Sequence, residues 1–263
     1  ETLDDQKAEY ILNYCKERKI EISSLAFYPN TMDPDEQKRE ENIRHLKSVI
    51  DASAKLNVNM VTTFIGRDQT KSVEENLKLV EKIWPPILEY AKERKVKIAI
   101  ENCPMLFTED EWPGGKNIAV SPAIWRELFK RLPSEYLGLN FDPSHFIWQE
   151  MDYIRPLYEF KDKIFHVHYK DIRVDKEARN EVGVLATPLS YMVPCIPGHG
   201  DVNWARYISA LLEIGYQGAA CIEVEDKSFE DNNENIENSL KISRQYLKQF
   251  IHFPEKGRQY AKD

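Results

Sequence analysis

The chain has 263 residues, a mass of 30.8 kDa and a formal net charge of −8. This acidic balance argues against a nucleic-acid or anionic-membrane partner, and no stretch approaches the ~20 apolar residues of a membrane span. The length suits one α/β barrel, which takes roughly 250 residues, so we expect a single domain over residues 1–263. The four cysteines lack metal-finger spacing, which favours reduced thiols and a cytoplasmic protein.

Helical and strand-like segments alternate along the chain. An amphipathic N-terminal helix precedes IEISSLAFYPN, a charged helix over residues 35–56 precedes NMVTTFIG, and SVEENLKLVEKIWPPILEYAKERK precedes VKIAIEN. We expect Pro85 and Pro86 to kink or break that third helix. SPAIWRELFKRL then leads to YLGLNFDPSH, and a short helix near 152–159 leads to IFHVHYKD. Residues 172–200 are rich in loops around YMVPCIPG, VNWARYISALLEIG leads to GAACIEVED, and a long helix through Phe250 follows.

Strands separated by helices predict parallel βαβ units, and hence a (β/α)8 TIM barrel. Seven candidate strands can be counted, around Ile22, Val61, Ile98, Leu139, Phe165, Val193 and Ile222. A closed barrel needs eight strands, and the first visible element is a helix that leads into a strand. We therefore expect the first strand and most of its helix to be missing from this sequence. A doubly wound open sheet is the alternative, although no glycine-rich phosphate loop follows any strand.

Four of these strands end in metal-ligand residues: Glu101, Asp142, His168 and Glu223. Strand alternation puts each of them on the face opposite the large apolar residues, which should pack against the helices. The four side chains should then converge at the C-terminal end of the barrel, where active sites of this architecture lie. A single such residue would more often be a helix cap or an ion-pair partner. Two glutamates, an aspartate and a histidine together suit Mn²⁺, Mg²⁺ or Co²⁺, with Zn²⁺ as a further alternative.

The motifs IAIEN, FDPSHFIWQ, HVHYKD, PGHGDVNW and IEVED resemble, in this order, the strand-end motifs of the xylose isomerase-like TIM-barrel superfamily. Within it they are similar to the sugar phosphate isomerase/epimerase family, which includes the ketose 3-epimerases. The resemblance covers the chain from Ile20 to Phe250. It implies one divalent metal ion, Mn²⁺ in first place, held by Glu101, Asp142, His168 and Glu223. It also implies a strand and a helix ahead of Glu1.

The resemblance implies an isomerase or epimerase of a sugar or keto sugar. The metal would polarise the carbonyl and stabilise an enediolate, while Glu101 and Glu223 act as catalytic acid and base on opposite faces. His145 matches a substrate-binding histidine of the family. Arg173 lies one residue nearer to the ligand histidine than the family's substrate-binding arginine.

Other candidate substrate-binding residues lie near the strand ends. Trp112, in a loop with two glycines, and Trp148 offer indole faces on which a sugar can stack, although packing is the commoner role of each. His199 lies in the PGHGD loop and is a further candidate. Arg67 and Lys170 could bind an anionic group, but ordinary ion pairs account for them as well. His166, one step deeper than His168, is expected to support the site or the core rather than to ligate.

Three other functions are compatible with parts of the pattern. A dehydratase would use the same metal and base to expel a β-hydroxyl group, as in family members that resemble inosose or dehydroshikimate dehydratases. The superfamily's apurinic endonucleases bind three zinc ions, but AFYPN and TFIGRD lack the histidines that this cluster needs. A sugar-binding barrel without chemistry would not need the acid and base residues. A small sugar is the expected partner, and a homodimer or tetramer is a family-level expectation.

Overall fold

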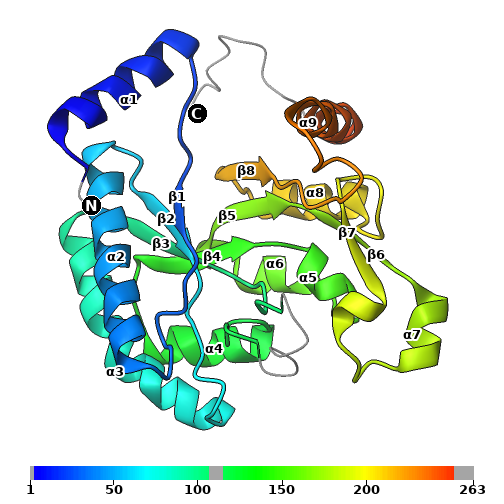
Figure 1. The fold of residues 1–263 in the computed structure, drawn as a ribbon, viewed down its shortest axis with the longest axis horizontal. Helices are drawn as coiled ribbons and strands as arrows, with labels where there is room; N and C mark the ends of the chain where they lie inside the picture. The colour runs from blue at the N-terminus through cyan, green and yellow to red at the C-terminus, as the bar shows by residue number, and fades with distance from the viewer. Residues whose placement is uncertain (1–2, 107–114, 252–263) are drawn as a thin grey trace.

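A curved sheet of six parallel strands forms the centre of the molecule, with helices along its outer side (Figure 1). The computed structural model describes residues 3–106 and 115–251. The strand order is β1-β2-β3-β4-β5-β8, and a separate two-stranded ribbon pairs β6 with β7. The strands are β1 Leu25–Phe27, β2 Met60–Thr63, β3 Lys97–Glu101, β4 Leu137–Phe141, β5 Ile164–Tyr169, β6 Asp171–Val174, β7 Met192–Cys195 and β8 Ala219–Ile222.

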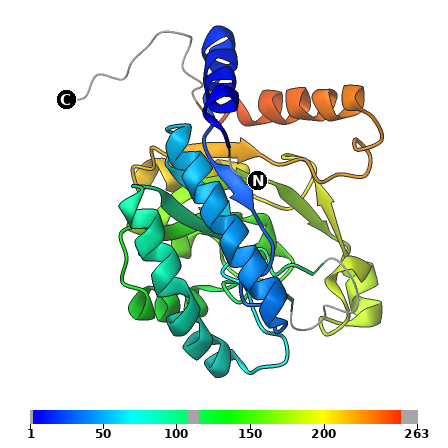
Figure 2. The same ribbon diagram turned by 60° about the vertical axis from the view of Figure 1, so that its left-hand side comes forward.

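Helices connect successive strands of the sheet, as parallel pairing requires. The α2 and α3 helices lie side by side on the outer face, whereas α1 extends past the sheet near β1 (Figures 1 and 2). None of the helices in the described ranges has the length and apolar composition needed to cross a membrane. The helices are α1 Asp5–Arg18, α2 Glu36–Lys55, α3 Val73–Glu93, α4 Pro122–Arg131, α5 Ser144–Ile147, α6 Arg155–Glu159, α7 Lys176–Val182, α8 Trp204–Glu213 and α9 Asn233–Leu247, with 3-10 turns at Lys161–Lys163 and Pro188–Ser190.

The sheet has the alternating parallel architecture predicted for a TIM barrel, but it contains six strands rather than the seven expected. The segment around Val193 forms β7, which runs antiparallel to β6 with Arg173 opposite Val193. The chain between β6 and β7 turns back after the short α7 helix instead of crossing over the sheet, so the two strands pair as a ribbon. The first candidate strand was predicted around Ile22, but Ile22 lies before β1, which begins at Leu25.

The sequence predicted that Pro85 and Pro86 kink or break α3, and the predicted break is wrong. The helix runs from Val73 to Glu93 with Pro85 and Pro86 inside it. It begins with a complete capping box between Ser72 and Glu75, which satisfies free amide groups of the first turn. Trp84 is fully buried beside the prolines, so tertiary packing offsets the lost backbone hydrogen bonds.

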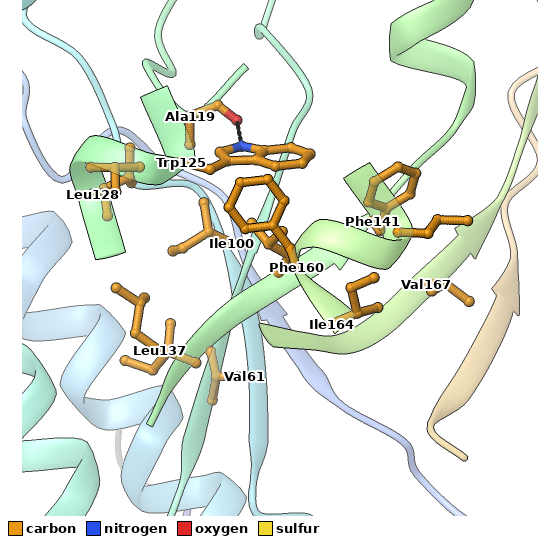
Figure 3. Packing of buried hydrophobic residues seen from close by; sticks show 14 of the residues in the cluster. Val61, Ile100, Ala119, Trp125, Leu128, Leu137, Phe141, Phe160, Ile164 and Val167 are labelled. Atoms are coloured by element: carbon orange, nitrogen blue, oxygen red, sulfur yellow. Dashed lines mark hydrogen bonds between the residues drawn. The ribbon is translucent and has the colours of Figure 1, made fainter. Parts of the chain in front are cut away.

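The apolar face of the strands packs against the helices, as the alternation predicted. Ile100, Phe141 and Val167 belong to one buried cluster with Trp125 of α4, whose indole Nε1 donates to the Ala119 carbonyl at 2.7 Å (Figure 3). This face covers the outside of the sheet and leaves the polar residues of the same strands on the inside. The core therefore fixes the direction in which the candidate site residues point.

An irregularity in β5 changes one detail of the predicted pattern. Leu139 pairs with Ile164, but the next residue, Asn140, pairs with His166, so Phe165 is an extra residue opposite no partner. As a result Ile164, rather than Phe165, joins the outward-facing core together with Val167. Such a bulge re-aims side chains without ending the strand. It brings His166 and His168 onto the inner face level with Asn140 and Asp142.

Candidate metal and acid–base site

The structure brings together the four side chains predicted as metal ligands. Glu101 ends β3, Asp142 directly follows β4, His168 lies near the end of β5, and Glu223 directly follows β8. One ligand atom from each lies within 4.8 Å of all the others. Glu101, Asp142 and His168 are buried, whereas the Glu223 side chain keeps 29% of its surface exposed. We call these residues the four-ligand group; they open to solvent on the Glu223 side.

The chemistry of the group fits a cation. His168 Nδ1 lies 3.1 Å from Glu223 Oε2 and 3.7 Å from Glu101 Oε2. Three buried atoms form ion-pair contacts but no hydrogen bond of good geometry in the described part of the chain: Asp142 Oδ2, His168 Nδ1 and Glu223 Oε2. Buried polar atoms normally have partners. Two oxygens and an imidazole nitrogen held at close range without hydrogen bonds form a donor set that suits a divalent ion.

Lys170 supplies a fixed positive charge to the group. Its buried ammonium nitrogen lies 3.3 Å from Asp142 Oδ2 and 3.2 Å from both Glu223 Oε2 and Glu225 Oε2. Burial alone would lower the pKa of Lys170, but the surrounding carboxylates raise it well above its ordinary value. The lysine is therefore charged and is an ion-pair partner of the site, the second of the two roles considered from the sequence.

A hydrogen-bonded chain behind His168 orients its ring. Asn140 contacts His168 Nε2 at 3.0 Å through its amide and His166 Nδ1 at 2.9 Å, and His166 Nε2 lies 3.2 Å from Ser23 Oγ. As placed, Asn140 Nδ2 faces His168 Nε2 and Asn140 Oδ1 faces His166 Nδ1. A cation on His168 Nδ1 requires the ring proton on Nε2, and the Asn140 oxygen accepts that proton when the side-chain amide is flipped, so that its oxygen and nitrogen exchange places. His166 thus supports the site, as predicted. Burial lowers its pKa to about 4, which keeps its ring neutral.

Paired asparagine contacts fix the ends of β3 and β4 relative to each other. Asn102 Nδ2 donates to the Asp142 carbonyl at 2.9 Å, and the Asp142 amide donates to Asn102 Oδ1 at 2.8 Å. Asn117 Nδ2 donates to the carbonyls of Glu101 and Cys103 at 2.9 and 2.7 Å. All of these groups are buried, so the carboxylates of Glu101 and Asp142 are held in place by their backbones.

The electrostatics of the group distinguish its histidine from its carboxylates. Burial would lower the pKa of His168, but Glu101 and Glu223 raise it to about 11. Burial would raise the pKa of Glu101, but His145, His168 and Lys170 hold it well below its usual range. At neutral pH and without a cation, His168 is therefore protonated and Glu101 is ionised. A bound cation must displace the His168 proton.

The predicted substrate-binding residues lie in different places. His145 is buried at the start of α5, and its Nε2 is 3.3 Å from Asp142 Oδ2 and 3.7 Å from Glu101 Oε1. Arg173 is exposed on β6, and His199 is exposed in the loop after β7, with its ring 6.1 Å from that of Phe229. Trp112 lies outside the described residues. Only His145 of these predicted residues is shown to contact the four-ligand group.

The structure adds residues that the sequence did not single out and settles the place of Trp148. Tyr28, just after β1, contacts the group: burial and then the charge of Glu101 raise the pKa of its hydroxyl. No motif marks this tyrosine, although its place after a strand is a usable signal. Asn140 shares the inner face with Asp142, which the alternation already indicated.

Trp148 is buried against Leu106 and Ile172, so its indole packs in a small apolar cluster.

Comparisons with known proteins agree with this geometry. A family model described as "Xylose isomerase-like TIM barrel" matches residues 1–248. An uncharacterized protein of Bacillus subtilis, YfiH, is 31% identical over 125 residues, which cover 44% of this chain. An inosose dehydratase of Lactiplantibacillus plantarum is 27% identical over 117 residues, again 44% of this chain. Each alignment covers 38% of the relative's own length.

Solved structures share the fold over nearly the whole chain. IOLI protein with a bound zinc atom has a TM-score of 0.70 and 19% identity, covering 95% of this chain and 84% of that one. The "probable 3-DHS dehydratase AsbF" of Bacillus anthracis has a TM-score of 0.69 and 18% identity, with coverage of 93% and 82%. A D-tagatose 3-epimerase-like protein has a TM-score of 0.67 and 19% identity, with coverage of 94% and 84%. At these identities the likeness establishes the fold.

Proposed function

Because the chain belongs to the xylose isomerase-like TIM barrel family, as its motifs predicted, we propose that it is a divalent-metal-dependent isomerase or epimerase of a sugar or keto sugar. Family relatives and structural neighbours include epimerases and dehydratases, which supports an enzyme. The observation that carries the proposal is the four-ligand group, whose donor atoms lie within 4.8 Å of one another at the strand ends.

Glu101, Asp142, His168 and Glu223 are the residues that would hold the metal. Mn²⁺ is the first candidate because three carboxylates and one imidazole form a largely oxygen-donor set, and Zn²⁺ is supported by the zinc atom of a neighbour. A divalent cation, when bound here, would polarise a substrate carbonyl and acidify the adjacent C–H bond. The remaining chemistry is proton transfer by the side chains around it.

Glu101 and Glu223 are suited to move the proton. They come from β3 and from the segment after β8, which are separated in the sheet by β4 and β5. A substrate between them would meet one carboxylate on each face, so one glutamate can remove a proton and the other can return one to the opposite side. Glu223, which is partly exposed, can exchange a transferred proton with solvent, whereas a proton that buried Glu101 takes up is shielded from water.

A dehydratase is the second candidate, and a specific observation favours it. The Lactiplantibacillus plantarum relative is an inosose dehydratase, and a structural neighbour is a probable 3-DHS dehydratase. The same base would remove a proton next to a carbonyl, and an acid would then protonate a leaving β-hydroxyl group. Burial would lower the pKa of His145, but Cys103 and Asp142 raise it to about 10. His145 and Lys170 are then cationic groups at the site that could assist this departure.

The decisive experiment is turnover of a panel of keto sugars and keto cyclitols in D₂O by the Mn²⁺-loaded chain, followed by mass spectrometry. An isomerase or epimerase gives a product of the substrate's mass plus one exchanged deuterium, whereas a dehydratase gives a product that has lost water. Glu223→Gln should lower the rate by roughly 10²–10⁴. Glu225→Gln is the matched control, because Glu225 also contacts Lys170 but lies outside the four-ligand group.

Two results would contradict the proposal. Equal rates for Glu223→Gln and the parent chain would exclude the acid–base role of Glu223. A Mn²⁺-loaded chain that binds sugars but never exchanges deuterium would favour a sugar-binding barrel without chemistry.

A further inference from the structure

A second group of metal-ligand side chains adjoins the four-ligand group. Glu101, Cys103 and His145 are all buried, and one ligand atom from each lies within 4.8 Å of the other two. We call them the thiol group. Glu101 is the one residue that belongs to both groups. The proposed mechanism gives Cys103 no role.

The two carboxylate oxygens of Glu101 face different histidines. Oε1 lies 3.7 Å from His145 Nε2, and Oε2 lies 3.7 Å from His168 Nδ1. One oxygen thus points into each group, which is the arrangement of a carboxylate that bridges two ions. The His145 side chain is more than nine-tenths buried, and its Nε2 forms no hydrogen bond within the described ranges, although Asp142 Oδ2 lies 3.3 Å away. A buried imidazole nitrogen that lacks a hydrogen bond is open to a further ligand.

The backbone of the thiol group is held before any ion binds. Asn117 Nδ2 ties the Glu101 and Cys103 carbonyls together, and the Met105 amide approaches Cys103 Sγ at 3.4 Å. His145 lies on α5, which directly follows the Asp142 segment that Asn102 fixes to the end of β3. The three ligands therefore need little rearrangement to approach a common ion.

We propose that Glu101, Cys103 and His145 form a second metal site, selective for Zn²⁺ and bridged to the four-ligand group by Glu101. A thiolate and an imidazole are the soft and borderline donors that favour Zn²⁺, whereas the carboxylate-rich group favours harder ions such as Mn²⁺. On binding, the Cys103 thiol and the protonated His145 ring each give up one proton to solvent. The thiolate, His145 Nε2 and Glu101 Oε1 then supply three donors, and a water molecule takes the fourth position that Zn²⁺ requires.

The test compares metal stoichiometry and spectra of the whole chain and its variants. The metal-free protein is titrated with Zn²⁺ or Mn²⁺ alone, and a Co²⁺-loaded sample is examined for the ultraviolet charge-transfer band of a cobalt–thiolate bond. We expect two Zn²⁺ but one Mn²⁺ per chain, and a thiolate band. Cys103→Ser should bind one Zn²⁺ and lose the band, and His145→Gln should also lose one Zn²⁺. Cys195→Ser is the matched control, because Cys195 is also buried but lies outside both groups.

The outcomes separate this proposal from the proposed function. A Co²⁺-loaded chain without a thiolate band, or equal Zn²⁺ stoichiometry in the parent and Cys103→Ser, would overturn the thiol group as a metal site. If Cys103→Ser does not fold, His145→Gln and the parent's thiolate band decide the question by themselves. Failure of the parent to bind Mn²⁺ would count against the four-ligand group and would leave the thiolate test unaffected.

Discussion

Replacement of Lys170 by methionine should affect the metal-free and the metal-loaded protein in different ways. Methionine keeps the apolar body of the side chain but removes the ammonium that contacts Asp142, Glu223 and Glu225 at 3.2–3.3 Å. Removal of one partner from a buried ion pair costs about 3–5 kcal/mol, because the other charge is left buried without compensation. At about 2–4 °C per kcal/mol, the melting temperature of the metal-free protein should fall by roughly 6–20 °C.

A bound cation should reverse part of this effect. The cation would compensate the charge of the same carboxylates, and in the parent protein the Lys170 ammonium would repel this cation. We therefore expect Lys170→Met to lose less stability in excess Mn²⁺ and to bind Mn²⁺ at least about tenfold more tightly, which is ~1.4 kcal/mol. Differential scanning calorimetry with and without Mn²⁺, together with isothermal titration, measures both quantities.

The matched control is Lys163→Met. Lys163 precedes β5 and donates to the carbonyls of Ser134 and Leu137 rather than to carboxylates. Its replacement should lower the melting temperature by the same amount with and without Mn²⁺. An equal loss in both states for Lys170→Met would refute the electrostatic reasoning.

Three further predictions concern the surroundings of the site. Asn140→Ala removes the side chain that orients His168, so the Mn²⁺ affinity measured by isothermal titration should fall about 10–100-fold. An unchanged Mn²⁺ affinity would contradict this orienting role. The pKa of His168 is raised to about 11, so its contribution to the stability of the metal-free protein is complete below pH ~6.5 and is lost as the pH rises toward 11. The melting temperature of the metal-free protein should therefore decline over this pH range, and metal-free His168→Gln should lack this decline. Asp171→Ala leaves four hydrogen-bond donors without their acceptor, among them Trp204 Nε1 at 2.8 Å. It should lower the free energy of unfolding in denaturant by roughly 3 kcal/mol, and a loss below about 1 kcal/mol would contradict this role of Asp171.

Local sequence patterns were sufficient to predict the convergence of the four ligands. Strand alternation has a period of two, so the apolar partners Ile100, Phe141 and Val167 already determined which face each polar residue occupies. Parallel βαβ order then placed all four strand ends on one side of the sheet. Neither step needs knowledge of distant contacts. This is why the positions of Glu101 and Asp142 could be inferred from the sequence.

The features that sequence reasoning missed depend on contacts between distant segments. YMVPCIPG has a strand-like composition, but its pairing partner is β6, and composition does not show whether a strand pairs in parallel or antiparallel. The extra residue at Phe165 arises from the register between β4 and β5, which period-two counting assumes to be regular. The segment that contains Pro85 and Pro86 stays helical because the buried Trp84 side chain packs in the core, and this packing depends on distant parts of the chain. Tyr28 and Cys103 reach the site through loops that no periodicity describes.

The charges around the four-ligand group favour a divalent ion over ions of other charge. Glu101, Asp142, Glu223 and Glu225 bring four carboxylates together. Without a metal, the protonated rings of His145 and His168 and the ammonium of Lys170 offset three of them. One negative charge then remains without compensation in a largely buried place, which is costly. A divalent cation that displaces the His168 proton offsets all four carboxylates together with His145 and Lys170, whereas a monovalent ion would leave one carboxylate without a compensating charge. A trivalent ion would leave a buried positive charge. The lysine beside the ligands thus helps to set the charge of the ion that the site can hold.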